Sequence, residues 1–283
     1  MTTEVPAETV EAANAKSRRL RELLQAPEIV IMPGAFNVLS ALLFQHLGFQ
    51  AVQGSSAGIA NAMGYPDLGI GRDRTVAVTK EMVAAVSVPV NADGEDGFGG
   101  PEEVQETVRQ FVAAGAAGMN MEDGVEGGLA TLDAQLEKIA AFMEARQAMG
   151  SEFLLNARVD AFVKMREERG EALKEAIRRG QAYAEAGADS VFFFGPHQPD
   201  EIGTLAKEVP APVSVLAAPG VPGAAELERL GVARVSYGSM FLRVAVGAVE
   251  RAAREVLELK THELMGDAIG GAEMRAILES RRG

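Results

Sequence analysis

The chain has 283 residues, 47% of them hydrophobic, so it can bury a large core; it has no cysteine, which excludes disulfides, a thiolate nucleophile and thiolate-ligated metals. Its 27 basic residues against 40 acidic ones give a net charge of −13, a poor match for nucleic acid or an anionic membrane. Because no apolar run reaches membrane-spanning length and the first residues resemble neither a signal peptide nor a transit peptide, we expect a cytoplasmic protein.

Residues 1–28 are predicted to form a helix before the first strand of the fold. From there on, short apolar runs alternate with amphipathic helical stretches. Four of these stretches end at a glycine about two residues before the next apolar run, and glycine suits the left-handed residue that closes a helix. Those glycines are Gly48, Gly115, Gly187 and Gly231. The eight apolar runs predicted to be strands lie near residues 29–32, 50–54, 88–92, 118–121, 153–157, 189–194, 213–217 and 233–237.

Nearly continuous apolar strands that alternate with helices predict a parallel sheet covered by helices. Eight such units fit an α/β fold of the (β/α)8 TIM-barrel type, with a doubly wound open sheet as the alternative. No linker divides the chain, so we expect residues 1–283 to form one domain. Its last part, from about residue 240 to 283, is expected to be a helical arm, because the tail is too polar for a barrel strand.

Acidic side chains follow the predicted strands at the end where barrel enzymes place their chemistry. Asp93 and Glu95 follow the third strand in the segment NADGEDGFGG, Glu122 ends the fourth, and Asp67 lies in the loop after the second. Hard oxygen ligands without histidine or cysteine suit Mg²⁺ or Mn²⁺. A lone acid at a strand end is otherwise commonly a helix cap or a solvated loop residue.

Arg158 ends the fifth predicted strand, two residues after Asn156, where an unpaired guanidinium would be unfavourable. Two interpretations are open. Arg158 could form a buried ion pair with Glu122 or Asp160, or it could bind a substrate carboxylate through its two-pronged guanidinium.

Other polar residues at strand ends, Asn156 among them, are weaker candidates for substrate binding. Ser55 and Ser56 follow the second strand and could bind a carboxylate or phosphate, or could simply cap a helix. His197 lies beyond the sixth strand and is a candidate for contact with the substrate.

The segments GSSAGIANAMGYPD, NADGEDGFGG, NMEDG and LLNARVDAF together closely resemble the isocitrate lyase/phosphoenolpyruvate mutase superfamily, over roughly residues 15–255. The family signature Asp-x-Asp/Glu-x-Gly-aromatic-Gly is matched by Asp93, Glu95, Gly97, Phe98 and Gly99. The resemblance implies that Asp93 binds the metal directly and that Asp67, Glu95 and Glu122 hold it largely through water. It also implies that Ser55, Ser56 and Ala57 bind the oxo-acid end of the substrate and that Arg158 binds its carboxylate.

The same resemblance implies a (β/α)8 barrel whose last helix swaps into a neighbouring subunit, giving a homodimer or homotetramer. One segment departs from the family. Lyases for isocitrate and methylisocitrate carry a Lys-Lys-Cys-Gly-His-type loop after the fourth strand, with the cysteine as acid/base, and phosphonate mutases carry lysines and an asparagine there. Here Glu122 to Asp133 reads EDGVEGGLATLD, so those three activities are disfavoured.

We therefore expect a Mg²⁺-dependent enzyme that acts on a small 2-oxo or 2-hydroxy acid through a metal-stabilised enolate, most simply as a carbon–carbon lyase. The alternatives are an oxaloacetate-type decarboxylase, a phosphonopyruvate-type hydrolase, or a 2-oxo-acid-binding protein that has lost catalysis. The proton donor that would replace the missing loop residues is left open between Tyr65, Glu122, His197 and a metal-bound water.

Overall fold

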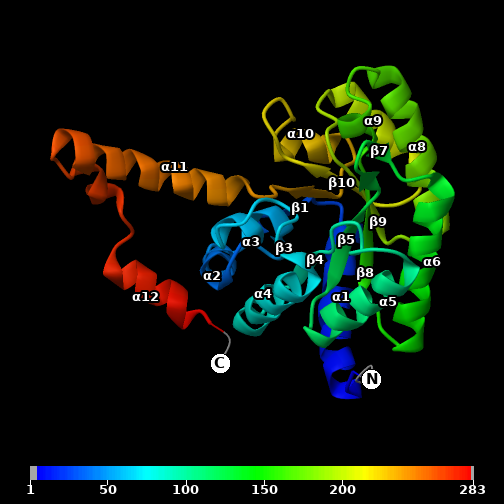
Figure 1. Cartoon of the computed structure of the whole chain (residues 1–283), viewed down its shortest axis with the longest axis horizontal. Coiled ribbons are helices and arrows are strands. Elements are labelled where there is room, and N and C mark those ends of the chain that lie inside the picture. The colour runs from blue at the N-terminus through cyan, green and yellow to red at the C-terminus, as the bar shows by residue number, and fades with distance from the viewer. Residues whose placement is uncertain (1–4, 282–283) are drawn as a thin grey trace.

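The computed structural model describes residues 5–281, and its centre is a parallel sheet that curves into a nearly closed barrel (Figure 1). The order of the strands is β1-β11-β10-β9-β8-β5-β4-β3-β2, with every neighbouring pair parallel. The strands are β1 (Val30–Met32), β2 (Gly34–Ala35), β3 (Val52–Gly54), β4 (Val90–Asp93), β5 (Gly118–Glu122), β8 (Leu154–Val159), β9 (Ser190–Phe193), β10 (Val213–Leu216) and β11 (Arg234–Ser236).

The first strand of the barrel is divided into β1 and β2 by Pro33, which has no N–H to donate to a ladder. Its first part pairs with β11 and its second part with β3, so this one strand joins the two ends of the sheet. Counting β1 and β2 together gives eight strand positions, and each overlaps a run predicted from the sequence. Strand β2 and the last residues of β4, β5 and β8 lie beyond the predicted runs. The predicted (β/α)8 barrel is confirmed.

Helices form the outer layer around the strands (Figure 1). Gly48, Gly115, Gly187 and Gly231, the four helix-closing glycines, all have positive φ, as predicted. A small hairpin of β6 (Gly124–Val125) and β7 (Gly128–Leu129) follows β5. The outer helices are α2 (Val38–His46), α3 (Ser56–Ala62), α4 (Gly71–Ala85), α5 (Pro101–Ala113), α6 (Leu132–Ala148), α7 (Ala161–Lys164), α8 (Arg169–Glu185), α9 (Pro199–Glu208) and α10 (Ala224–Arg229).

Helix α1 (Ala7–Gln25) is the helix predicted before the first strand, and it lies against the ends where the barrel strands begin. Leu20, Leu23 and Leu24 on its buried face belong to one apolar cluster with residues of β1 and β8. The Ser17 hydroxyl donates a hydrogen bond to the carbonyl oxygen of Ala117, 2.9 Å away and just before β5. The helix therefore covers the amino-terminal end of the barrel and leaves the opposite end for the chemistry.

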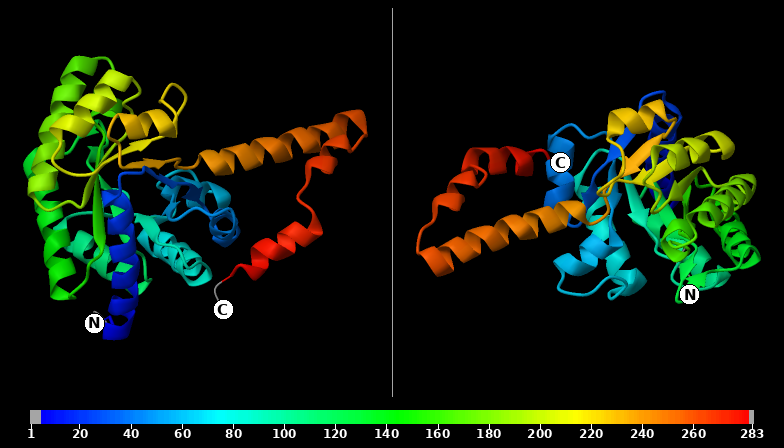
Figure 2. Two further views of the ribbon diagram at one scale, coloured as in Figure 1. Left: turned by 180° about the vertical axis from the view of Figure 1, so that it is seen from behind. Right: turned by 90° about the horizontal axis from the view of Figure 1, so that it is seen from above.

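The last part of the chain forms an arm that leaves the barrel. Helix α11 (Met240–Arg254) projects outward, and the chain then turns back through η1 (Glu255–Leu259) and η2 (Glu263–Asp267) to α12 (Gly271–Glu279) (Figures 1 and 2). Ile277 of α12 is buried against the apolar cluster beside α2. On α11 the side chains of Val244, Val246 and Val249 are 57–69% exposed. Exchange of this arm between subunits stays a prediction. No helix within residues 5–281 is long and apolar enough to cross a membrane.

Candidate active site

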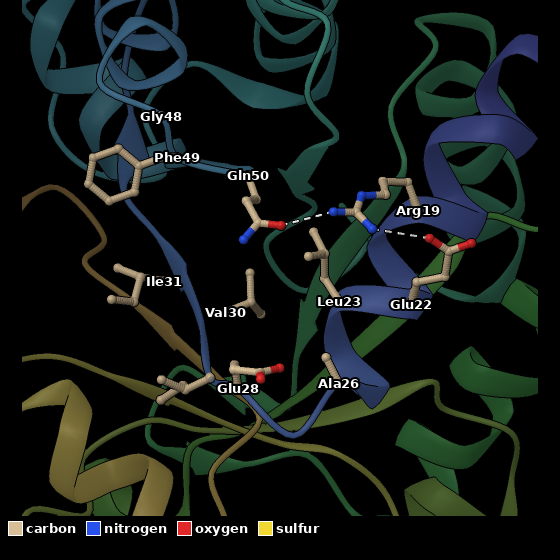
Figure 3. A pocket seen from close by; sticks show the side chains of 11 residues that line it. Arg19, Glu22, Leu23, Ala26, Glu28, Val30, Ile31, Gly48, Phe49 and Gln50 are labelled. Atoms are coloured by element: carbon tan, nitrogen blue, oxygen red, sulfur yellow. Dashed lines mark hydrogen bonds and ion pairs between the residues drawn. The ribbon is translucent and has the colours of Figure 1, made fainter.

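A cavity of about 250 Å³ opens at the carboxyl ends of the barrel strands. A second hollow, of about 480 Å³, lies at the amino-terminal end between α1 and the starts of β1 and β3 (Figure 3). There Arg19 contacts Glu22 and Gln50, and none of the predicted site residues is present. The first cavity is the candidate site, because the structure brings seven of the predicted residues to its wall: Ser55, Ser56, Ala57, Asp67, Asp93, Glu122 and Arg158.

Asp93 is the last residue of β4, and its carboxylate is held in a fixed orientation. Its Oδ2 accepts hydrogen bonds from the Ser56 backbone N–H (3.1 Å) and from the Ser56 hydroxyl (2.9 Å). The Ser55 hydroxyl instead accepts from the Gly58 N–H at the start of α3, so it caps that helix. Both serines line the cavity, and both hydroxyls already have partners in the fold.

Glu95 follows β4 in a tight turn with a positive φ of 48°, so the alternation expected from an extended strand ends before it. Its side chain is 93% buried and does not line the cavity, and its Oε1 has no hydrogen-bond partner among the described residues. Burial, with the charges of Asp93, Asp67 and Asp96, raises the pKa of Glu95 to about 7.

Two acids that line the cavity also have raised pKa values. Burial raises the pKa of Asp67, and the charge of Asp93 adds to this effect. Burial, together with the charges of Asp160, Asp93 and Glu95, raises the pKa of Glu122 to about 8 despite its contact with Arg158. Carboxyl groups whose pKa is raised by burial and by one another's charge would ionise more readily around a bound cation.

These residues fit Mg²⁺ bound by few direct ligands. Within residues 5–281 no three acidic, histidine or cysteine side chains converge closely enough to enclose an ion directly. Mg²⁺ keeps several of its waters and needs only one or two carboxylates. The oriented carboxylate of Asp93, the unpartnered oxygen of Glu95 and the all-oxygen donor set are what such a site requires.

Arg158 occupies a position that fits both interpretations, because it lies at the cavity and also beside two acids. It lines the cavity from the end of β8, and its guanidinium also forms ion pairs with two acids. Its Nη1 contacts Glu122, and its Nε and Nη2 donate to the two oxygens of Asp160 at 2.7 and 3.1 Å. One face of the guanidinium lies over the ring of Phe194, 4.3 Å from its centroid.

Asn156, His197 and Tyr65 do not line the cavity. Asn156 is buried inside the barrel, where its Nδ2 donates to Asn120 Oδ1 at 2.7 Å, and it reaches the cavity only through Asn120. The backbone N–H of His197 donates to Glu201 at the start of α9. Tyr65 is 40% exposed and lies beneath Arg74. Three of the four candidates for the missing proton donor are side chains, all within residues 5–281. Of these three, Glu122 lines the cavity and Tyr65 and His197 do not.

The loop that departs from the family pattern is a fixed hairpin. Lys164 donates from its Nζ to the carbonyl oxygen of Val125 at 2.7 Å, and Arg179 donates from its Nη2 to the carbonyl oxygen of Ala130 at 2.7 Å. The Asp123 side chain is buried, with Arg179 3.0 Å away and the Tyr183 hydroxyl 2.7 Å away. The hairpin is therefore anchored to the barrel at both ends.

Several residues of the site were not predicted from the sequence. Phe192, Phe194 and Leu216 line the cavity from the ends of β9 and β10, within runs that were predicted only to be strands. Their positions at the ends of predicted strands were the sequence feature that could have indicated a place at the cavity. A belt of buried polar side chains below the cavity was also not predicted, and it consists of Gln53, Asn91, Asn120, Asn156, Ser190 and Arg234.

Arg234 is the largest fully buried side chain of this belt. It donates to Gln53 Oε1, whereas its Nε and Nη1 have no partner within residues 5–281. Burial lowers the pKa of Arg234 to about 9. Gln53 and Asn120 reach the cavity floor from this belt, so the belt supports the polar part of the site from beneath.

Comparison with known proteins identifies the family of the chain. The sequence model of the phosphoenolpyruvate phosphomutase family matches residues 20–257. The 2-methylisocitrate lyase of Bacillus subtilis (strain 168) is 32% identical over 247 residues, which cover 82% of this chain and 79% of that protein. The 2,3-dimethylmalate lyase of Eubacterium barkeri is 32% identical over 246 residues, which cover 82% of each.

Among solved structures, a phosphonopyruvate hydrolase in complex with oxalate and Mg²⁺ has a TM-score of 0.81 at 30% sequence identity, covering 93% of this chain and 94% of that one. These matches confirm the family predicted from the motifs. The chain belongs to the isocitrate lyase/phosphoenolpyruvate mutase superfamily.

Proposed function

We propose that this protein is a Mg²⁺- or Mn²⁺-dependent lyase that breaks a carbon–carbon bond in a small 2-oxo or 2-hydroxy acid. The observation that carries the proposal is the meeting of Asp67, Asp93, Glu122 and Arg158 at one cavity above the barrel strands. Relatives at 32% identity are named lyases, and a structural neighbour was solved with oxalate and Mg²⁺, which supports an oxo-acid substrate and a divalent cation.

Asp93 would hold the metal directly, and Asp67, Glu95 and Glu122 would hold it largely through water. When bound, the cation would neutralise the negative charge that develops on a substrate oxygen as the adjacent carbon–carbon bond breaks. Ser56 keeps the Asp93 carboxylate aimed, because its N–H and hydroxyl both donate to the same oxygen.

Arg158 would bind the substrate carboxylate. Its pair with Asp160 uses Nε and Nη2, so Nη1, which now contacts Glu122, is the donor that an incoming carboxylate could take over. Glu122 would then be free to interact with the metal's waters or to transfer a proton. Burial and the neighbouring carboxylates raise its pKa to about 8, which suits a group that exchanges a proton near neutral pH.

A second candidate function is binding of a 2-oxo acid without catalysis. It is favoured by the hairpin after β5, whose sequence EDGVEGGLATLD supplies none of the acid/base residues of the family lyases.

The two functions differ in one measurable step. A lyase that stabilises an enolate should exchange the C3 protons of pyruvate with solvent deuterium, measured by proton NMR with Mg²⁺ present, and a binding protein should not. Exchange should stop when Mg²⁺ is removed or Asp93 is changed to Ala. Oxalate binding without exchange would favour the binding protein, and failure to bind either Mg²⁺ or oxalate would refute both.

A further inference from the structure

We propose, building on the function above, that the substrate's variable end is uncharged and apolar, and that Phe192, Phe194 and Leu216 select it. The acid therefore carries one carboxylate, which Arg158 binds, and an aliphatic group that packs on these three side chains. This would separate the protein from enzymes whose substrates carry a second carboxylate or a phosphonate.

The strand order places Leu216 of this apolar wall across the barrel from Asp93. Going around the barrel, β4 ends in Asp93 and β10 ends in Leu216 four positions further on, whereas Glu122 ends β5, two positions from β9. Phe192 pairs in register with Arg158 on the neighbouring strand, and Phe194 lies over the same guanidinium. A substrate held by Arg158 and facing Asp93 therefore extends its remaining atoms towards the two rings and Leu216.

The charges at the cavity exclude a second anion on that side. Among the described residues that line the cavity, Arg158 is the only cation, and it already pairs with Glu122 and Asp160. Arg234, below the floor, is fully buried and donates to Gln53. A second carboxylate there would have, among the residues described, no cation other than Arg158 and could contact only the hydroxyls of Ser236 and Ser239, and burying a charge without a counter-charge is strongly unfavourable.

The size of the cavity sets a further limit. At about 250 Å³ it is smaller than the roughly 300–1,000 Å³ typical of sites for drug-sized ligands, so the substrate is a short-chain acid.

One reaction class satisfies both limits and balances without a co-reactant, namely cleavage of a short aliphatic 4-hydroxy-2-oxo acid. The C4 hydroxyl loses its proton and becomes an aldehyde carbonyl, and the electron pair of the C3–C4 bond passes to C3. A proton then adds to C3. The products are a 2-oxo acid and an aliphatic aldehyde, with no net change in oxidation state.

Binding of matched acids tests the selectivity. 2-Oxovalerate and 2-oxoglutarate have the same five-carbon chain and differ in a terminal methyl against a terminal carboxylate. With the full-length protein and Mg²⁺ in isothermal titration calorimetry, we expect 2-oxovalerate to bind at least about 10-fold more tightly, since an unpaired buried charge is costly. Equal or tighter binding of 2-oxoglutarate would overturn the inference.

Two variants locate the selectivity at the wall. Phe194→Arg should shift the preference towards 2-oxoglutarate, whereas Phe194→Leu, the matched apolar control, should keep the wild-type preference. If Phe194→Arg does not fold, the wild-type comparison still decides. Oxalate binding distinguishes a failure of this selectivity from a failure of the proposed function. If oxalate binds with Mg²⁺ while the two acids bind equally, the selectivity is refuted and the general function is not.

Discussion

Arg158→Lys is the sharpest test of the site, because the structure gives Arg158 two functions that this substitution should damage together. Lysine keeps the positive charge but cannot reproduce the two parallel hydrogen bonds to Asp160 while also contacting Glu122. Hydrogen bonds to charged groups contribute about 1.5–3 kcal/mol each, so losing one should lower the free energy of unfolding by roughly that amount. In a urea unfolding experiment, this loss of stability should lower the midpoint concentration of urea without changing how steeply the free energy of unfolding depends on urea.

The same substitution should weaken oxalate binding. Losing a buried, charged hydrogen bond to the ligand reduces binding by roughly 2–5 kcal/mol, or about 30-fold to several thousandfold, and we expect the lower end because lysine retains the charge. Calorimetric titration with oxalate at saturating Mg²⁺ measures this. Metal affinity should change little, since Asp93 and Ser56 are untouched.

Arg169→Lys is a matched control for this experiment. Arg169 also pairs with both oxygens of one carboxylate, Glu201, and its guanidinium also lies over an aromatic ring, that of Phe162 at 4.9 Å. It does not line the cavity. Arg169→Lys should therefore lower stability and leave oxalate affinity unchanged. If Arg158→Lys gives the same pattern as this control, Arg158 is a structural ion-pair residue and its proposed contact with the substrate is refuted.

Three further predictions concern the metal, pH and assembly. Asp93→Ala should abolish Mg²⁺ binding in calorimetry, while Asp96→Asn in the same loop, whose partner is Lys138, should retain it; unchanged binding in the first variant would exclude Asp93 as a ligand. Without metal, the pKa values of Glu95 (about 7) and Glu122 (about 8) exceed the ordinary 4.5, so the folded state binds more protons than the unfolded state. The free energy of unfolding in EDTA should fall as pH rises from about 5 to 8, by up to roughly 1.4 kcal/mol per pH unit for each group, and a flat or rising curve would contradict the shifts. The valines exposed on α11 predict a homodimer or homotetramer that requires the arm, and a folded full-length monomer at micromolar concentration in analytical ultracentrifugation would be the opposite result.

The strands and the acidic half of the site could be predicted because both depend on local patterns. Apolar runs, helix-closing glycines and carboxylates at strand ends are visible along the chain, and barrel topology then brings the strand ends together. Asp93 and Glu122, 29 positions apart in the printed sequence, were placed at one site in this way. Alternate residues of an extended strand face the same side, which predicts that Glu95 lies beside Asp93 at the cavity; Glu95 does not line it, because the chain turns with a positive φ there.

The apolar half of the site could not be predicted because its residues look the same as core residues. Phe192 and Leu216 are apolar members of apolar strands, and only the closed barrel shows that their side chains reach the cavity. The buried position of Arg234 could not be predicted either, since its partner Gln53 is 181 residues away in the chain. The alternative that Arg158 pairs with Asp160 was recognisable, because the two residues are close in sequence.

The pairing of β1 with β11 also has a consequence for how the chain folds. This pairing joins Val30 to Arg234, so it closes a loop of about 200 residues, and contacts so distant in sequence form late and slowly. Until β11 has been synthesised, β1 presents an unpaired edge, which is a template for pairing with another chain. The leucines of α1, which are made first, also lack part of their packing surface until β8 follows. During synthesis, the first part of the barrel is therefore the segment most exposed to aggregation, and its protection depends on the last strand.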